Sequence, residues 1–172
     1  MGGLDVRLER IPVATARGLV RGSLARPAGW HPEFPADGTL NAARMLLGTY
    51  AALELDPELT PWWFFTMVVH DGVDDGMVVG DAGFHGPPPA DGPVEVEIGY
   101  QVVPAFRRRG LATRACALLL EHAWRNGAEV VRAEVEADNP HGAASRAVLQ
   151  ANGFRLTARG DFVVEAPVSA ST

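Results

Sequence analysis

Apolar and polar residues alternate near the start of the chain and again in its middle. Residues 4–11 and 94–103 carry apolar side chains at about every second position, which predicts two β-strands. Two runs rich in aromatic and β-branched residues, 62–70 and 77–86, predict two further strands. The turn sequence Gly-Val-Asp-Asp-Gly at 72–76 joins these two runs, so we expect them to pair as a hairpin.

A period of about 3.6 residues replaces the alternation elsewhere and predicts helices. Residues 40–55 place apolar side chains at i, i+3 and i+4, and Thr39 is the expected N-cap of this helix. Residues 111–126 are apolar around most of the helix, so we expect it to be buried on most sides against a sheet. Two more helices are expected at 14–24 and 143–152.

The remaining patterns complete a layered domain. Residues 129–138 predict a strand, and residues 154–167 predict two short final strands. The order β, α, α, β, β, β, loop, α, β, α, β, β places hairpins ahead of a β–loop–α–β unit, which predicts a mixed sheet in an α/β (α+β) fold. We expect a single domain over residues 1–166 and a flexible tail at 167–172.

Composition argues against several classes of protein. The net charge of −6 argues against a general nucleic-acid binder. No apolar run reaches roughly 18 residues and the first ten residues lack the apolar core of a secretory signal, so we expect no membrane association. The single cysteine, Cys116, excludes an internal disulfide and a multi-thiolate metal site. A reducing, cytoplasmic setting without a bound metal is the expectation.

All 15 basic residues are arginine. Without lysine the chain has neither a P-loop lysine nor a Schiff-base lysine, which excludes Walker-type nucleotide hydrolysis and pyridoxal-phosphate chemistry. Charge is also unevenly distributed, because residues 105–132 hold six arginines against two glutamates while the rest of the chain carries about −10. The sequence therefore predicts one local basic site on an acidic protein.

The basic site is centred on residues 107–112, Arg-Arg-Arg-Gly-Leu-Ala, between a predicted strand and a predicted helix. Pro104 ends the strand, and Gly110 can adopt a positive φ and lets another group approach the backbone closely. Unpaired N–H groups at the start of the helix should converge at the positive end of its dipole, which makes an anion site suited to a diphosphate. Taken alone, the same residues also fit a basic surface turn.

Two longer stretches carry a family resemblance. Residues 97–124 resemble the acetyl-CoA motif of the GNAT superfamily of N-acetyltransferases, whose pattern Gln/Arg-x-x-Gly-x-Gly/Ala is met by Arg107, Gly110 and Ala112. Residues 139–154 are similar to the second signature of that family, Asn-x-x-Ser followed by Gly-Phe. The chain looks most like the ribosomal-protein-alanine N-acetyltransferase branch. The resemblance implies a twisted, mostly antiparallel sheet of about 6–7 strands with a splayed central parallel pair, flanked by about 4 helices.

The resemblance also implies how acetyl-CoA, the co-substrate, is held. The pantetheine arm is expected in the gap beside strand 94–103, where backbone groups of Val102 and Val103 pair with its amides and one of them donates to the oxyanion. Arg107 is expected to brace the loop. The diphosphate is expected on the backbone N–H groups of Arg108, Arg109, Gly110, Leu111, Ala112 and Thr113, while the side chains of Arg108 and Arg109 reach phosphates or solvent.

One position departs from the family pattern. Asn139 lies six residues before Ser145 rather than three, because His-Gly-Ala is inserted between them. Either Asn139 still reaches the CoA arm across a longer loop, or its role is lost.

Acetyl transfer needs a neutral amine. A lysine-like amine with a pKa of about 10.4 is under ~0.1% neutral at pH 7, whereas an α-amino group near 8 is about 10% neutral, so a general base accelerates both. The resemblance implies Glu97 as this base, directly or through water, although Glu95 shares its face of the strand and both are candidates for solvated edge charges. Ser145 is the candidate to assist the thiolate, because Leu149 occupies the position of the family's tyrosine; a serine that caps a helix is the alternative.

Trp30, His31 and His85 are the candidates for contacting the acceptor, although a surface role also suits the histidines. The acceptor is expected to be a small-molecule amine or a peptide or protein N-terminus, with a cationic one favoured by the acidic body of the chain. A homodimer is a further expectation from the resembling branch. Two other functions stay open: a non-catalytic acyl-CoA-binding or sensor module, and an unrelated phosphate- or nucleotide-binding module.

Overall fold

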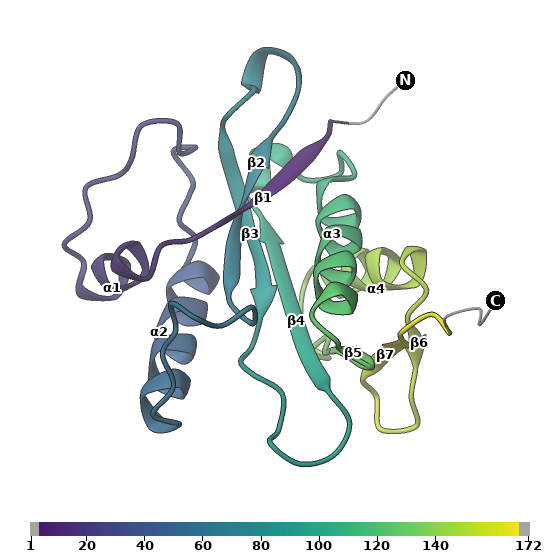
Figure 1. The fold of residues 1–172 in the computed structure, drawn as a ribbon. Coiled ribbons are helices and arrows are strands. Elements are labelled where there is room, and N and C mark those ends of the chain that lie inside the picture. The colour runs from purple at the N-terminus through teal and green to yellow at the C-terminus, as the bar shows by residue number, and fades with distance from the viewer. Residues whose placement is uncertain (1–3, 169–172) are drawn as a thin grey trace.

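A single seven-stranded sheet organises residues 4–168, the part of the chain that the computed structural model describes (Figure 1). The strand order is β1-β2-β3-β4-β5-β7-β6. Neighbouring strands are antiparallel except for β4 and β5, which are parallel. The strands are β1 (Val6–Arg10), β2 (Phe64–Val69), β3 (Val78–Phe84), β4 (Glu95–Val102), β5 (Val130–Ala133), β6 (Arg155–Leu156) and β7 (Phe162–Glu165). The predicted mixed, mostly antiparallel sheet is confirmed.

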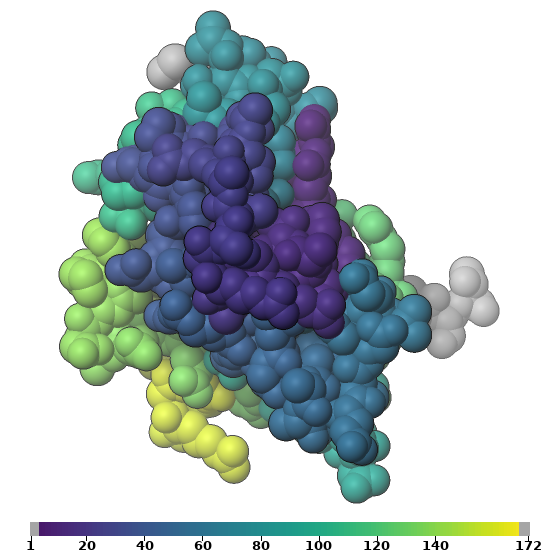
Figure 2. All heavy atoms as spheres, turned by 90° about the vertical axis from the view of Figure 1, so that its left-hand side faces the viewer, coloured from purple at the N-terminus to yellow at the C-terminus, as the bar shows by residue number. Residues whose placement is uncertain are grey.

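The helices cover the two faces of the sheet separately. In Figure 1, α1 and α2 lie on one face, and α3 and α4 lie on the other. Figure 2 shows α1, α2 and the loop between them spread over the first face, with the C-terminal strands emerging beside them. The helices are α1 (Val13–Arg21), α2 (Asp37–Ala52), α3 (Leu111–Arg125) and α4 (Gly142–Ala151), and short 3-10 turns lie at Gly72–Asp74 and Pro104–Phe106.

Several sequence-based boundaries shift. The predicted strand 129–138 is only β5, because its pairing with β4 and β7 ends by Ala133. Helix α2 begins two residues before the predicted cap, at Asp37. Thr39 is therefore not the N-cap; its hydroxyl accepts a hydrogen bond from the Ala36 N–H at 3.3 Å. Residues 169–172 of the predicted tail lie outside the described residues.

The core against α3 contains two residues with reactive side chains. Cys116 is fully buried there, and burial raises the pKa of its thiol to about 12. The thiol is therefore protonated and unreactive near neutral pH. His122 packs against the rings of Phe65 and Phe84, and its Nε2 lies 2.8 Å from the carbonyl oxygen of Pro61. Both side chains are packing residues.

A buried carboxyl ties α2 to the sheet. Asp81 on β3 is 5% exposed, and its Oδ2 accepts hydrogen bonds from Thr39 Oγ1 at 2.5 Å and from Gln101 Nε2 at 2.7 Å. Burial raises the pKa of Asp81 to about 6, although the two hydrogen bonds oppose the rise. This cluster holds the first turn of α2 against the end of β4.

We expect Asp81→Asn to remove a pH dependence of stability. The unfolded chain releases this proton near pH 3.8, while the folded protein keeps it to about 6. Folded protein thus binds more protons between these values, and the contribution of Asp81 to stability falls as pH rises through them. The free energy of unfolding of Asp81→Asn, minus that of wild type, should rise by on the order of 1–3 kcal/mol from pH 4 to 7 in urea titrations. A difference that stays flat, as expected for the exposed control Asp91→Asn, contradicts this assignment.

Candidate functional site

The parallel strands at the centre of the sheet separate after a short pairing. Residues 95–97 of β4 pair with β5, and β4 then continues to Val102 while β5 ends at Ala133. On its other side β4 stays paired with β3 as far as Val102. The splayed pair is thus confirmed, and residues 98–102 of β4 have one edge without a neighbouring strand.

Backbone groups point into this gap in a defined order. Val103 donates its N–H to the carbonyl oxygen of Val79 on the β3 side, at 2.8 Å. Because successive residues of a strand direct their backbone groups to opposite sides, the groups of Ile98, Tyr100 and Val102 face the gap. The structure therefore separates the two residues expected to pair with pantetheine: the N–H of Val103 is already bonded within the sheet, and that of Val102 faces the gap.

The loop after β4 presents unbonded N–H groups. The Arg107 N–H donates to the carbonyl oxygen of Pro104. The next backbone N–H that donates is that of Arg114, which bonds to the carbonyl oxygen of Gly110. Between these two donors, no N–H group from 108 to 113 forms a hydrogen bond with any residue in 4–168. A φ of 61° at Arg108 and of 80° at Gly110 turns the chain into the start of α3. This arrangement suits an anion.

The loop arginines have different contacts. Arg107 Nε donates to the carbonyl oxygen of Val102 at 2.9 Å, which braces the loop against the end of β4. Arg109 stacks on the ring of Phe106, 4.7 Å from its centroid, and bonds to the carbonyl oxygen of Ala105. Arg108 has an exposed side chain. Only Arg107 links the loop to the sheet among these three.

One face of β4 carries the candidate base. Glu97 Oε1 lies 2.9 Å from His85 Nδ1, so the structure brings together two residues that were predicted for different roles. Glu95, the alternative on the same face, is bonded to Arg132. A terminal nitrogen of Arg132 also donates a hydrogen bond to Asp161 Oδ2, at 2.5 Å. Of these two carboxylates, Glu97 is therefore the one that bonds to no arginine within residues 4–168. It also lies beside the start of the gap.

A groove of about 440 Å³ lies around Arg132 on the same face. Its position follows from the register, since Glu97 stands opposite Arg132. Four carboxylates and two guanidiniums line it, so its charge is negative. The lining residues are Glu95, Arg132, Glu134, Val135, Glu136, Arg159, Gly160 and Asp161.

The opposite face of β4 carries Ser145. The phenol oxygen of Tyr100 lies 3.0 Å from Ser145 Oγ and donates to the carbonyl oxygen of Ser145 at 3.2 Å. Burial raises the pKa of Tyr100 to about 12, so its hydroxyl keeps its proton near neutral pH. Leu149 is fully buried in the core, so no acid stands at that position. Tyr100 went unassigned in the sequence, although the alternation of β4 places it on the face opposite Glu97.

The inserted segment before α4 contacts the loop. Asn139 Oδ1 accepts a hydrogen bond from the His141 N–H at 2.8 Å, which shapes the turn into α4. His141 Nε2 lies 3.1 Å from a terminal nitrogen of Arg107. Sequence reasoning missed His141, because an insertion relative to the family pattern carries no signal of where it folds.

The three acceptor candidates do not form one cluster. Trp30 pairs with Val78 at the start of β3, and the ring of His31 packs 5.4 Å from that of Phe106. His85 follows the other end of β3. At about 3.4 Å per residue Val78 and His85 are roughly 24 Å apart, so Trp30 and His31 lie near the arginine loop and His85 near the start of the gap.

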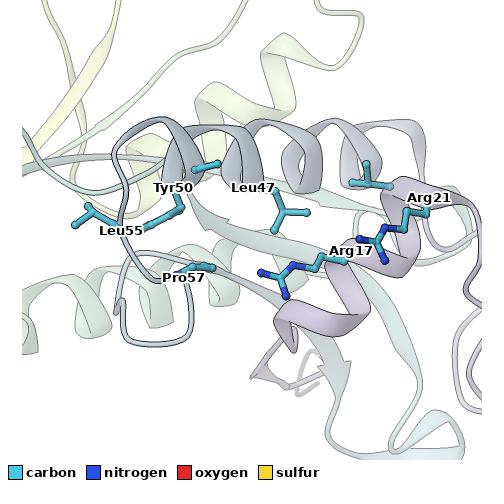
Figure 3. Close-up of a pocket in the computed structure, with 8 residues that line it drawn as sticks. Arg17, Arg21, Leu47, Tyr50, Leu55 and Pro57 are labelled. Atoms are coloured by element: carbon cyan, nitrogen blue, oxygen red, sulfur yellow. The ribbon is translucent and has the colours of Figure 1, made fainter.

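A second hollow lies away from the gap, between α1 and α2 (Figure 3). Arg17 and Arg21 reach over an apolar floor that includes Leu47 and Tyr50. Within residues 4–168 no helix is long and apolar enough to cross a membrane. The same stretch contains no group of three or more His, Cys, Asp or Glu side chains placed to hold a metal ion.

Comparisons with known sequences identify one family. A family model described as an acetyltransferase (GNAT) domain matches residues 14–155. No curated protein sequence matches the chain.

Several solved structures share the fold. The yncA protein of Salmonella typhimurium, with acetyl-CoA, has a TM-score of 0.60 at 21% identity, over 99% of this chain and 98% of that one. RimJ of Mycobacterium smegmatis, with CoA-disulfide, also has a TM-score of 0.60 at 21% identity, over 99% and 89%. The NatC complex bound to Gag peptide and CoA has a TM-score of 0.55 at 13% identity, over 95% and 99%. At these identities the likeness concerns the fold alone.

Proposed function

The chain belongs to the GNAT acetyltransferase family, and on that premise we propose that it is an acetyl-CoA-dependent N-acetyltransferase acting on a primary amine. The observation that carries the proposal is the open edge of β4, which leads directly into the unbonded N–H groups of the following loop. An extended ligand with a diphosphate at one end and amides along its length matches both parts.

In the proposed complex, acetyl-CoA lies along the open edge of β4. The diphosphate would accept hydrogen bonds from the N–H groups of residues 108–113, at the N-terminus of α3. The pantetheine amides would pair with the backbone of Val102 and Tyr100, as an added strand does. The thioester then comes to lie near the point where β4 and β5 part, beside Glu97.

The reaction we propose is a direct attack in a ternary complex. Glu97 supplies the carboxylate for general-base catalysis. The amine nitrogen forms a bond to the thioester carbon as it gives up a proton. The gap-facing backbone N–H nearer the thioester, that of Tyr100, would stabilise the oxyanion. The C–S bond then breaks, and Ser145, whose Oγ lies 3.0 Å from the phenol oxygen of Tyr100 on the other face of β4, would donate a hydrogen bond to the thiolate.

The acceptor we propose carries positive charge. The groove beside Glu97 holds more carboxylates than guanidiniums, which favours a cationic amine over a neutral or acidic one. A peptide or protein N-terminus and a small polyamine both satisfy this requirement. Trp30 and His31, close to the arginine loop, are placed nearer to the CoA end than to the amine.

Acetyl-CoA is expected to raise the melting temperature, since a ligand at about 100 times its Kd adds about 2.7 kcal/mol to stability. Adding a peptide with a free N-terminus, spermidine or an aminoglycoside should then release free thiol with at least one of them. Ser145→Ala should lower turnover while acetyl-CoA affinity stays unchanged. A thermal shift without thiol release supports the alternative, a non-catalytic acyl-CoA-binding module, and no thermal shift at millimolar acetyl-CoA refutes both.

A further inference from the structure

We propose that His85 is the group that accepts the amine proton, and that Glu97 acts through it as a positioning carboxylate. This inference rests on the proposed acetyl transfer and assigns the atom at which the proton is taken.

The pairing of β3 with β4 holds His85 and Glu97 together. The His85 N–H donates to the carbonyl oxygen of Glu97 at 2.9 Å, so the two residues are directly opposite at the end of the hairpin. Their side chains then meet on the same face, with Nδ1 and Oε1 2.9 Å apart. Both side chains are more than one-third exposed, 39% for His85 and 37% for Glu97, and both are therefore accessible to a substrate.

Only one ring nitrogen of His85 is committed to Glu97. With the carboxylate accepting from Nδ1–H, the neutral imidazole carries its lone pair on Nε2. That nitrogen lies over Gly99, where a Cβ atom would come within 2.6 Å of it. Gly99 pairs with Gly83 of β3 but lies beyond the last residue of β4 that pairs with β5, so Nε2 lies over the stretch of β4 that begins the gap.

Chemistry favours the imidazole over the carboxylate as the group that meets the amine. A proton acceptor is most effective when its pKa lies near the working pH, and histidine ordinarily titrates near 6.5 whereas glutamate titrates near 4.3. A carboxylate bonded to Nδ1 orients the ring and stabilises the imidazolium that forms, as in hydrolases that use a carboxylate–histidine pair.

The step balances without a further reagent. The amine nitrogen forms the C–N bond and passes its proton to Nε2, and the C–S bond breaks with its electron pair on sulfur. The imidazolium returns its proton to water, and the thiolate takes one from water. The products are the amide, free CoA and the regenerated imidazole.

The tautomer can be measured without an acceptor. In 15N-labelled protein in which the His85 ring is neutral, we expect the proton on Nδ1 and an unprotonated Nε2. In Glu97→Gln the preference for a proton on Nδ1 should weaken, because a glutamine amide can donate a hydrogen bond as well as accept one. A wild-type spectrum with the proton on Nε2 overturns the proposal, since that nitrogen would then be unable to accept the proton of the amine.

Turnover provides the second test. With whichever of the three amine probes releases thiol, His85→Ala should lower kcat/KM by about 10-fold or more while acetyl-CoA affinity stays within two-fold. Free imidazole should restore part of the loss, which a structural role would not permit. Glu97→Gln should lose less, and the double variant should be no worse than His85→Ala alone. Gly99→Ala, which displaces Nε2, should lower kcat with both side chains present.

His70→Ala is the matched control, because His70 also stands near a carboxylate, with Nδ1 3.5 Å from Asp75 Oδ1 on the surface. It should leave kcat/KM unchanged. Wild-type activity in His85→Ala, or a loss that imidazole leaves unchanged, contradicts the role of His85 while the proposed function stands. Wild-type protein that binds acetyl-CoA but acetylates none of the three probes contradicts both.

Discussion

Ala112→Asp is expected to weaken acetyl-CoA binding by about 100-fold, which corresponds to about 2.7 kcal/mol. Ala112 is the second residue of α3 and lies among the N–H groups that bond to no residue in 4–168. A carboxylate there competes for the donors that the diphosphate would use and repels its charge. Isothermal titration with acetyl-CoA and with CoA measures the loss, which should be equal for both because the change lies far from the acetyl group.

The folded state should tolerate this substitution. An acidic residue in the first turn of a helix interacts favourably with the helix dipole, by about 0.3–1 kcal/mol, and α3 has none. Ala14→Asp provides the matched control, because Ala14 holds the same second position in α1, on the opposite face of the sheet. Ala14→Asp, at an exposed position, should unfold at or above the wild-type urea midpoint, whereas Ala112→Asp, at a half-buried position against the core, should lose some stability but stay folded. Equal CoA affinities for the two would mean that the start of α3 is not the diphosphate site.

Trp63→Ala is expected to cost about 3–5 kcal/mol in the free energy of unfolding. Trp63 is fully buried between α1, α2 and the sheet, where its ring packs edge-on against Tyr50 and Phe64. Its Nε1–H donates to the carbonyl oxygen of Ile11 at 2.8 Å. Truncation therefore leaves a large cavity and also deprives a buried carbonyl of its partner.

A second substitution at this position separates the two costs. Trp63→Phe keeps most of the ring but loses the donor, so it should cost about 1–3 kcal/mol. Leu59→Ala serves as control, because Leu59 is 83% exposed and a surface truncation typically changes stability by less than about 0.5 kcal/mol. Urea unfolding at low temperature gives all three values. A loss below about 1.5 kcal/mol for Trp63→Ala would mean that the face covered by α1 and α2 can repack around the missing ring.

Local patterns identified most of the secondary structure. Strict alternation gave β4 its two faces, and the apolar circumference of 111–126 identified the buried helix α3. The strand predicted at 129–138 was too long, because its composition suits a strand while its pairing with β4 ends at Arg132 and its pairing with β7 ends at Ala133. The pairing of β4 with β3 decides which of the two valines has a backbone N–H in the gap, because that of Val103 is bonded to Val79.

Some residues of the candidate site could be predicted from local sequence, and others only from the structure. The sequence identified Arg107, Gly110 and Ala112, because an anion loop is built from consecutive residues and a helix start. It offered Glu97 and Ser145 as separate candidates, without the side chains that contact them. His85 and Tyr100 acquire their partners through pairings that join distant segments.

The sequence by itself determined the order of the elements, the family and the place of a candidate anion loop, since each depends on residue types at short, fixed spacings. Only the tertiary structure decided which backbone groups of β4 face the gap, the Glu97–His85 pair and the Tyr100–Ser145 contact. The physical reason is that strand register and helix docking depend on the whole set of buried side chains. A one-residue slip would turn every side chain of β4 to the other face, so local patterns cannot place a partner that lies across the sheet.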